Sequence, residues 1–278
     1  MTKGDDLLVK KTKVTVQFLD RITPDNKDYG DNYSERAKKI GKYFREEYNA
    51  MRFELENTRF FKNQLIKNYI YKGPVLEWYL KTKLQMENNY ELFNSIVPRS
   101  GRIYDIGCGY GYLSYMLHFV ANERKLIGID YDCEKIEVAN NCPSKNNQVN
   151  FECADITKYN FESGDVFLLS DVLHYLPKED QETLINNCIK NLNNGGIIVI
   201  RDANTNLKER HKGTKFSEFM STKIIGFNKT KDDSKQLYFI SSDDILEIFK
   251  QHDMEVETVD QTKLTSNVVY IIKKNSNS

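Results

Sequence analysis

The sequence contains few of the features that define several large classes of protein. Its five cysteines are an odd number and form no Cys-x-x-Cys pair, which argues against a disulfide framework and a zinc site. No apolar run approaches the roughly 18 residues of a transmembrane helix, and the first residues lack the apolar core of a signal peptide. We therefore expect reduced thiols, no metal, no transmembrane segment in this chain and a cytoplasmic location.

An excess of charge of one sign is also lacking, since the 278 residues include 40 Lys and Arg and 40 Asp and Glu. A nucleic-acid-binding domain usually shows a basic excess, so nucleic acid is not an expected partner. With 40% hydrophobic and 29% charged residues, the composition is that of an ordinary globular protein. The length allows one large domain, or one domain with an appendage.

The pattern of apolar residues changes near residue 100. Before this point, residues 6–20 alternate between apolar and polar side chains, which predicts one or two short strands. Three helices are then predicted at residues 35–56, 60–70 and 74–97. Ser34 is the candidate N-cap of the first helix, and Trp78 and Tyr79 are expected to be core residues of the third.

After Gly101, short strands alternate with helices, which is typical of βαβ units. We expect an α/β fold with a doubly wound, mostly parallel seven-stranded sheet, preceded by a strand-plus-helix extension. The last two strands, near 254–259 and 268–273, are expected to form an antiparallel pair at one edge. The predicted domains are the extension at 1–70 and a domain at 71–278, with a lid at 203–238.

A glycine-rich loop follows the first strand of this sheet, in the segment Asp105-Ile-Gly-Cys-Gly-Tyr-Gly111. Ligands of such sheets bind at the carboxyl ends of the strands, and an acid at the end of the next strand, Asp130, suits a ribose diol. A dinucleotide fingerprint would require glycine where Tyr112 stands, so an NAD(P)-dependent oxidoreductase remains only an alternative. The negative charge of Asp105 would attract a cationic ligand. The candidate cofactor residues of the loop are Asp105, Gly107, Cys108, Gly109 and Gly111.

Residues 74–273 resemble the class I S-adenosylmethionine-dependent methyltransferases. The similar segments are Asp105–Gly111, Gly128-Ile-Asp-Tyr-Asp132, Cys153-Ala-Asp-Ile156, Leu169-Ser-Asp-Val-Leu-His-Tyr175 and Leu192-Asn-Asn-Gly-Gly196. The resemblance implies S-adenosylmethionine as cofactor, with Gly107 and Gly109 at its methionine part and Asp130 at its ribose. It further implies that Asp155 binds the adenine amino group, that Tyr131 and Ile156 pack on the adenine, and that Ser170 and Asp171 lie beside the methionine part.

The expected activity is methyl transfer to a small or lipid-linked acceptor, phenols included, by in-line displacement. Aligning two bound reactants can supply about 7–11 kcal/mol of barrier reduction, so few ionisable residues are needed. His174, Tyr175 and Arg201 are the candidate catalytic residues because the fold places them beside the acceptor pocket, and His174 is a candidate base. A domain that binds S-adenosylmethionine without catalysis is a second alternative.

The N-terminal residues, to about residue 55, resemble the C-terminal end of a lysophosphatidic acid acyltransferase. That family's catalytic His-x-x-x-x-Asp is absent, since His118 and His174 each have glutamate five residues later. Our hypothesis is that the chain continues an upstream acyltransferase in lipid or aryl-polyene pigment assembly. The alternative is that residues 1–70 are a helical cap of this domain alone.

Overall fold

The computed structural model describes residues 16–86, 89–203, 237–260 and 267–274, which divide into two compact units. The first unit ends at Asn57 and the second begins at Thr58. The predicted lid at 203–238 lies almost wholly outside the described residues, as do residues 6–15 of the predicted strands. Residues 16–20 are described and form no strand, so the strand prediction is wrong there.

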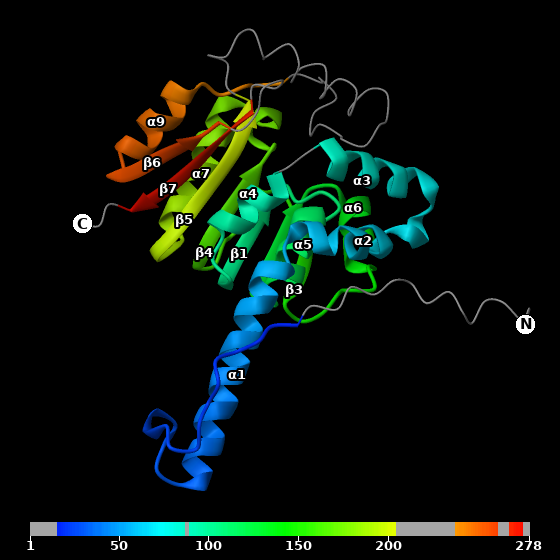
Figure 1. Ribbon diagram of the computed structural model, residues 1–278. Helices are drawn as coiled ribbons and strands as arrows, with labels where there is room; N and C mark the ends of the chain where they lie inside the picture. Colours follow the sequence, from blue (N-terminus) through cyan, green and yellow to red (C-terminus); the bar gives the residue numbers. More distant parts are fainter. Residues whose placement is uncertain (1–15, 87–88, 204–236, 261–266, 275–278) are drawn as a thin grey trace, which may run out of the picture. The chain divides into compact units, whose positions relative to one another are not determined.

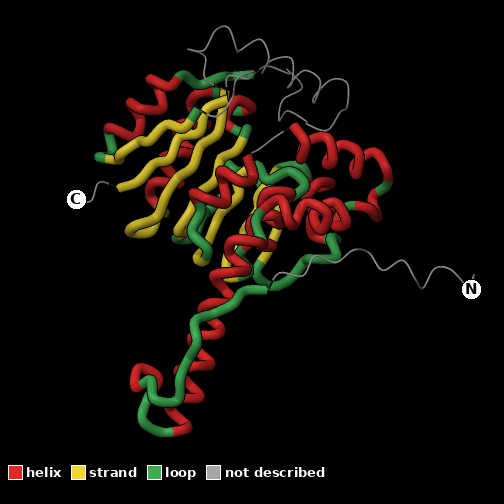
Figure 2. The backbone as a smooth tube through the Cα atoms, in the orientation of Figure 1, coloured by secondary structure: helices red, strands yellow, loops and turns green. Residues whose placement is uncertain are grey.

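The first unit consists of a long helix, α1 (Tyr33–Leu55), and the loop that runs along it (Figure 2). The helix confirms the prediction at residues 35–56. Its N-cap is Asn32 instead of Ser34, because the Asn32 side chain accepts a hydrogen bond from the Glu35 N–H at 2.9 Å. Within this unit the loop contacts α1 through Gln17 and Glu47, and through the rings of Tyr29 and Tyr43.

The second unit is built on a seven-stranded sheet of order β3-β2-β1-β4-β5-β7-β6 (Figure 1). Strands β1 to β5 are parallel, and β6 and β7 form an antiparallel pair at one edge, as predicted; β7 also pairs antiparallel with β5. The order reverses between β1 and β4, so the carboxyl ends of these strands border a crevice. The bounds are β1 (Ser100–Ile106), β2 (Glu123–Asp130), β3 (Val149–Cys153), β4 (Gly164–Ser170), β5 (Leu192–Ala203), β6 (Met254–Val259) and β7 (Asn267–Lys274).

Helices cover both faces of the sheet. One core contains side chains of α2 (Thr58–Asn68), α3 (Pro74–Met86), α4 (Asn89–Ile96), α5 (Tyr112–Val120) and α6 (Cys133–Asn140). The other core contains side chains of α7 (Lys178–Lys190) and α9 (Ser242–Lys250). The helix predicted at 74–97 is therefore two helices, α3 and α4.

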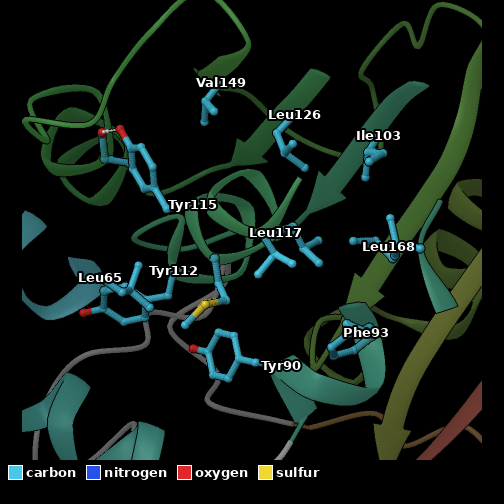
Figure 3. Packing of buried hydrophobic residues seen from close by; sticks show 14 of the residues in the cluster. Leu65, Tyr90, Phe93, Ile103, Tyr112, Tyr115, Leu117, Leu126, Val149 and Leu168 are labelled. Carbon is cyan, nitrogen blue, oxygen red and sulfur yellow. Dashed lines mark hydrogen bonds between the residues drawn. The ribbon is translucent and has the colours of Figure 1, made fainter. Parts of the chain in front are cut away.

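Alternate side chains of the central strands enter the two cores, as the two-residue period of a strand requires. Ile103 of β1 packs with the α2–α6 helices, whereas Tyr104 packs with α7. Figure 3 shows Leu117 of α5 among the strand residues and Phe93 of α4 in the same cluster. Helices α2, α3 and α4, which precede β1 within the second unit, are thus joined to the sheet by a continuous apolar core.

The expectation that Trp78 is a core residue is wrong, because 59% of its surface is exposed. Leu76, Leu80 and Leu84 recur at four-residue spacing and form the buried face of α3. Trp78 lies about 200° around the helix from Leu76 and therefore faces outward. Tyr79 is half-buried.

Two of the five cysteines form a disulfide, which corrects the expectation of five reduced thiols. Cys133 at the start of α6 is bonded to Cys153 at the end of β3, with their Cα atoms 5.0 Å apart. Parallel pairing of β2 with β3 brings these residues together across 20 positions of sequence. Among the described helices, none is long and apolar enough to cross a membrane.

Candidate active site at the carboxyl ends of the strands

The glycine-rich loop between β1 and α5 is fixed to the end of β2 by backbone hydrogen bonds. The N–H groups of Gly107 and Cys108 donate to the Ile129 carbonyl at 2.8 and 3.1 Å. Asp130 accepts from the Gly109 N–H at 2.8 Å through Oδ2 and from the Asp132 N–H at 2.9 Å through Oδ1. The acid predicted to bind ribose therefore lies directly against the loop.

Two glycines of the loop have different surroundings. Gly109 has a φ of +55°, and a Cβ there would meet only Lys135 Cδ at 4.0 Å, so its backbone is open to a ligand. Gly111 has a φ of +74°, and a Cβ there would lie 2.4 Å from the Phe151 ring. Gly111 is thus required for packing at the start of α5.

A cavity of about 1330 Å³, its open mouth included, lies over the strand ends. The predicted residues that line it are Asp105, Gly107, Cys108, Gly109, Asp130, Tyr131, Asp155, Ile156, Ser170, Asp171 and Tyr175. Gly111, His174 and Arg201 are not among its lining residues.

Acidic side chains give this cavity its electrostatic character. Asp105, Asp130, Asp155 and Asp171 all line it, from the ends of β1 to β4. Burial raises the pKa of Asp105 to about 6, although the Ser114 hydroxyl, which donates to it at 2.6 Å, lowers that pKa. S-adenosylmethionine carries a sulfonium and an ammonium and has no phosphate, so the acids and the open Gly109 backbone fit it.

The ends of β2 and β3 provide a second polar region of the cavity. Asp155 Oδ1 accepts from the N–H of Thr157 at 3.1 Å and from its hydroxyl at 2.7 Å, which fixes the carboxylate. Ile156, the residue after Asp155, and Tyr131, the residue after β2, also line the cavity. An acid that lines the same cavity as flat or apolar side chains suits a planar group with an exocyclic amine, such as adenine.

Asp171, just after β4, has a φ of 57°, which is unusual for a residue other than glycine. Its carboxylate forms an ion pair with Arg201 and accepts from Asn267 Nδ2 at 3.0 Å. The side-chain amide of Asn89 turns its oxygen toward the Arg201 guanidinium, where it accepts a hydrogen bond from Arg201 Nε at 3.1 Å. Residues of α4, β5 and β7 therefore fix the position of one cavity carboxylate.

The three candidate catalytic residues occupy different positions. His174 is buried, and its Nδ1 lies 2.7 Å from Asp202 Oδ1. Arg201 is buried beside Asp171. Tyr175 lines the cavity, and its ring centroid lies 4.3 Å from that of His174.

Several lining residues were not predicted from the sequence. Lys135 of α6 is nearly buried, with Nζ 4.0 Å from Asp132 Oδ2 and 5.7 Å from the Tyr110 ring centroid. Its place one helical turn after Asp132 is a signal that the sequence contains. The α3 and α4 residues had no such signal, because their position depends on helix packing. The unpredicted lining residues are Tyr79, Lys83, Asn89, Tyr90, Phe93, Tyr110, Tyr112, Leu113, Lys135, Val172 and Leu176.

Curated relatives match the middle of the chain. Carboxy-S-adenosyl-L-methionine synthase of Actinobacillus pleuropneumoniae serotype 5b is 29% identical over 119 residues, which are 40% of this chain and 48% of that protein. The protein of the same name from Campylobacter jejuni is 27% identical over 115 residues, with the same coverage. The chain thus spans about half the length of the curated relatives it matches.

Solved structures share the fold at low sequence identity. Human N-acetylserotonin methyltransferase in complex with SAM has a TM-score of 0.54 and 14% identity, covering 73% of this chain and 56% of that chain. PH0226 of Pyrococcus horikoshii has a TM-score of 0.52 and 14% identity, covering 70% and 91%. A family model described as a methyltransferase domain matches residues 99–258, more than half of the chain. The chain therefore belongs to this family of methyltransferases.

Proposed function

We propose that the enzyme methylates a small or lipid-linked acceptor, phenols included, bound between the strand ends and helices α3 and α4. One observation supports this most: a single cavity joins the acids of the sheet to the aromatic side chains of Tyr79, Tyr90 and Phe93. An apolar, aromatic wall opposite the cofactor loop suits an acceptor with a flat or hydrocarbon body.

The proposed cofactor contacts follow the order of the strands. Asp105, Gly107 and Gly109 would contact the methionine part, with Ser170 and Asp171 beside it. Asp130 would accept hydrogen bonds from the ribose, and its bonds to the N–H groups of Gly109 and Asp132 orient its carboxylate for this. Asp155 would accept from the adenine amino group, between Tyr131 and Ile156. Cys108 would contribute its backbone to the loop.

When bound, the cofactor supplies a methyl group that its sulfonium already activates. The protein's task is then to align the acceptor and exclude water, which is a matter of orientation more than of acid–base strength. Asp171 is suited to orienting a ligand, because three neighbouring side chains fix its position.

Tyr175 is the proposed acceptor contact among the three candidate catalytic residues, because it lines the cavity. His174 is hydrogen-bonded to Asp202 and packs against the ring of Tyr175, so it would act by positioning Tyr175. Arg201 would act by positioning Asp171. Arg201→Met should then raise the KM for S-adenosylmethionine more than it lowers kcat, a split that steady-state kinetics measures.

Transfer of radioactive methyl from S-adenosylmethionine to a panel of phenolic and lipid-linked phenolic acceptors tests the proposal. The expected result is labelled product with at least one acceptor, and loss of that product in Tyr175→Ala. Binding without transfer across the panel would favour a domain that binds the cofactor without catalysis.

The names of the curated relatives give a second candidate, modification of S-adenosylmethionine itself to a carboxylated form. An added carboxylate would need a cation, and Lys83 and Lys135 line the cavity. Mass spectrometry of the nucleoside recovered after incubation with cell extract separates the two. A gain of one carboxylate would favour the second candidate, and S-adenosylhomocysteine alone would favour methyl transfer.

We also propose that an acyltransferase precedes this chain in a longer polypeptide of lipid or pigment assembly in the cytoplasm. The resemblance of the first 55 or so residues to the end of such an enzyme supports this. Sequencing the transcript upstream of Met1 tests it. An in-frame stop codon directly upstream would contradict it.

A further inference from the structure

The segment of residues 58–86, which forms α2, a short 3-10 helix and α3, has a strong excess of positive charge. Residues 58–86 contain six basic residues and a single acid, Glu77, although the whole chain has 40 of each sign. The basic residues are Arg59, Lys62, Lys67, Lys72, Lys81 and Lys83. Such local segregation in a chain without net charge indicates a partner of opposite charge.

The same segment exposes large apolar side chains. In the described part of the second unit, seven large hydrophobic residues are exposed, and five of them fall between residues 60 and 78. Val75 is 65% exposed, Trp78 59% and Ile70 53%. Helix α3 buries Leu76 and Leu80 on its inner face, so its outer face is not needed for the core.

The exposed residues follow one another in space along the end of α2, the short helix η3 (Ile70–Lys72) and the first turns of α3. Figure 1 shows α2 and α3 beside each other at one side of the sheet. We define the α3 outer surface as Lys67, Ile70, Lys72, Val75 and Trp78, all of which are exposed. On another side of the same helix, Tyr79 and Lys83 line the cavity.

We propose that the α3 outer surface binds an anionic lipid bilayer. Tryptophan and aliphatic side chains enter the boundary between lipid head groups and acyl chains, and flanking lysines are attracted to anionic head groups. A second copy of this chain is a poorer partner. A two-fold interface would place the same basic residues opposite each other, where their charges repel.

Binding in this way brings the mouth of the cavity near the lipid, because α3 contributes to both. A lipid-linked acceptor would then reach the site from the bilayer. This consequence rests on the proposed function, whereas bilayer binding itself does not.

Trp78 is the only tryptophan in the sequence, so its fluorescence reports on this surface directly. The full chain is titrated with vesicles of phosphatidylcholine alone and with vesicles containing phosphatidylglycerol. We expect a blue shift of the emission and co-sedimentation with the anionic vesicles only, and weakening of both by added salt.

Variants separate the apolar and the electrostatic contributions. Val75→Glu should weaken partitioning at least tenfold, and Lys67→Gln and Lys72→Gln about fivefold each. Leu246→Glu, at an exposed leucine of α9, and Lys190→Gln on α7 are the matched controls and should leave partitioning unchanged. Unchanged affinity for S-adenosylhomocysteine verifies that each variant is folded.

The absence of a blue shift with anionic vesicles would overturn the proposal, as would equal binding to neutral vesicles. A blue shift that grows with protein concentration without lipid would assign the surface to self-association instead. Methylation of a water-soluble phenol without vesicles tests the proposed function separately, so the failure of one does not imply the failure of the other.

Discussion

At the scale of single residues, Asp105 and Asp130 lie at the ends of adjacent strands but have different surroundings. Asp105 is buried and receives a hydrogen bond from the Ser114 hydroxyl. Asp130 accepts from two backbone N–H groups of the loops on either side of it. Burial dominates the pKa of Asp105 and raises it to about 6, so this acid titrates in an accessible range of pH.

The titration of Asp105 makes cofactor binding dependent on pH. A cationic ligand favours the ionised carboxylate, so the affinity for S-adenosylmethionine should rise from pH 5 to about pH 7 and then level off. Calorimetric titration at several pH values measures this. Asp105→Asn should weaken binding and remove the dependence, and a dependence that persists in that variant would contradict the assignment.

The raised pKa of Asp105 also affects the stability of the ligand-free protein. The stability should fall as pH rises, whereas the affinity for the cofactor should increase. The native state binds this proton more tightly than the unfolded state, whose carboxyl has its ordinary pKa near 3.8. The contribution of Asp105 to the free energy of unfolding should therefore fall as pH rises from about 4 to about 6, and stay constant above. Urea denaturation of the native protein and Asp105→Asn across this range measures the difference.

Asp130→Ala should weaken S-adenosylmethionine by roughly 1.5–3 kcal/mol, the usual magnitude for a hydrogen bond to a charged group. The carboxylate would contact the ribose and also orient the Gly109 N–H, which donates a hydrogen bond to it at 2.8 Å. Asp180→Ala, at a half-buried acid of α7 that does not line the cavity, is the control. Unchanged affinity in Asp130→Ala would show that another acid binds the ribose.

At the scale of secondary-structure elements, Arg124 at the start of β2 joins two helix ends. Its guanidinium is fully buried and donates to carbonyl oxygens of Val97 at 2.6 Å and Leu117 at 2.9 Å, just after α4 and within α5. It also donates to Pro98 and Asn94. A cation at helix C-termini is favoured by their dipoles, although burial lowers the pKa of Arg124 to about 10.

Arg124→Leu should lower the free energy of unfolding by about 3 kcal/mol or more, because several buried carbonyls lose their donor at once. Chemical denaturation measures this. Lys125→Leu, at the exposed neighbouring position of β2, is the matched control and should change stability by less than about 0.5 kcal/mol. A small effect of Arg124→Leu would mean that water replaces the guanidinium.

The disulfide between Cys133 and Cys153 joins α6 to β3 beside Tyr131. Alkylation of the oxidised protein in denaturant should modify three cysteines, Cys108, Cys142 and Cys188, and all five only after reduction. Closing a loop of this length should stabilise the protein by about 3 kcal/mol. Five modified cysteines without reductant, in protein purified under air, would contradict the pairing.

The sheet was largely predictable from the sequence, because its strands are short apolar runs separated by helices and loops of regular length. The glycine loop and Asp130 were predictable for the same reason, since both are close to a strand end. The α3 and α4 lining residues were not, because helical periodicity identifies a helix but not what it packs against. His174 and Arg201 were predicted beside the acceptor pocket, but they do not line the cavity, because their side chains are held by Asp202 and Asp171.

At the scale of the whole molecule, the second unit combines one acidic cavity with one basic outer surface in a chain without net charge. The acids converge on the carboxyl ends of the strands, where the cationic cofactor would lie. The basic residues of the segment 58–86 lie on α2, η3 and α3, which would face the bilayer. Overall charge therefore conceals two regions of opposite sign with separate proposed roles.

The domain boundary predicted at residue 70 lies between the segments that carry the two family resemblances, whereas the compact units divide between Asn57 and Thr58. Residues 58–70 form most of α2, whose Phe61 and Leu65 enter the core shared with α5. An amphipathic helix in sequence does not show to which neighbour its apolar face belongs, which is why the boundary was difficult to predict.

Calorimetric titration of the full chain with S-adenosylmethionine, S-adenosylhomocysteine and NADH shows which cofactor the cavity binds. We expect micromolar binding of the first two ligands and none of NADH, with the affinity for S-adenosylmethionine falling below pH 6. Binding of NADH alone, or affinity for S-adenosylmethionine unaffected by Asp105→Asn and Asp130→Ala, would contradict a methyltransferase site at the ends of β1 and β2.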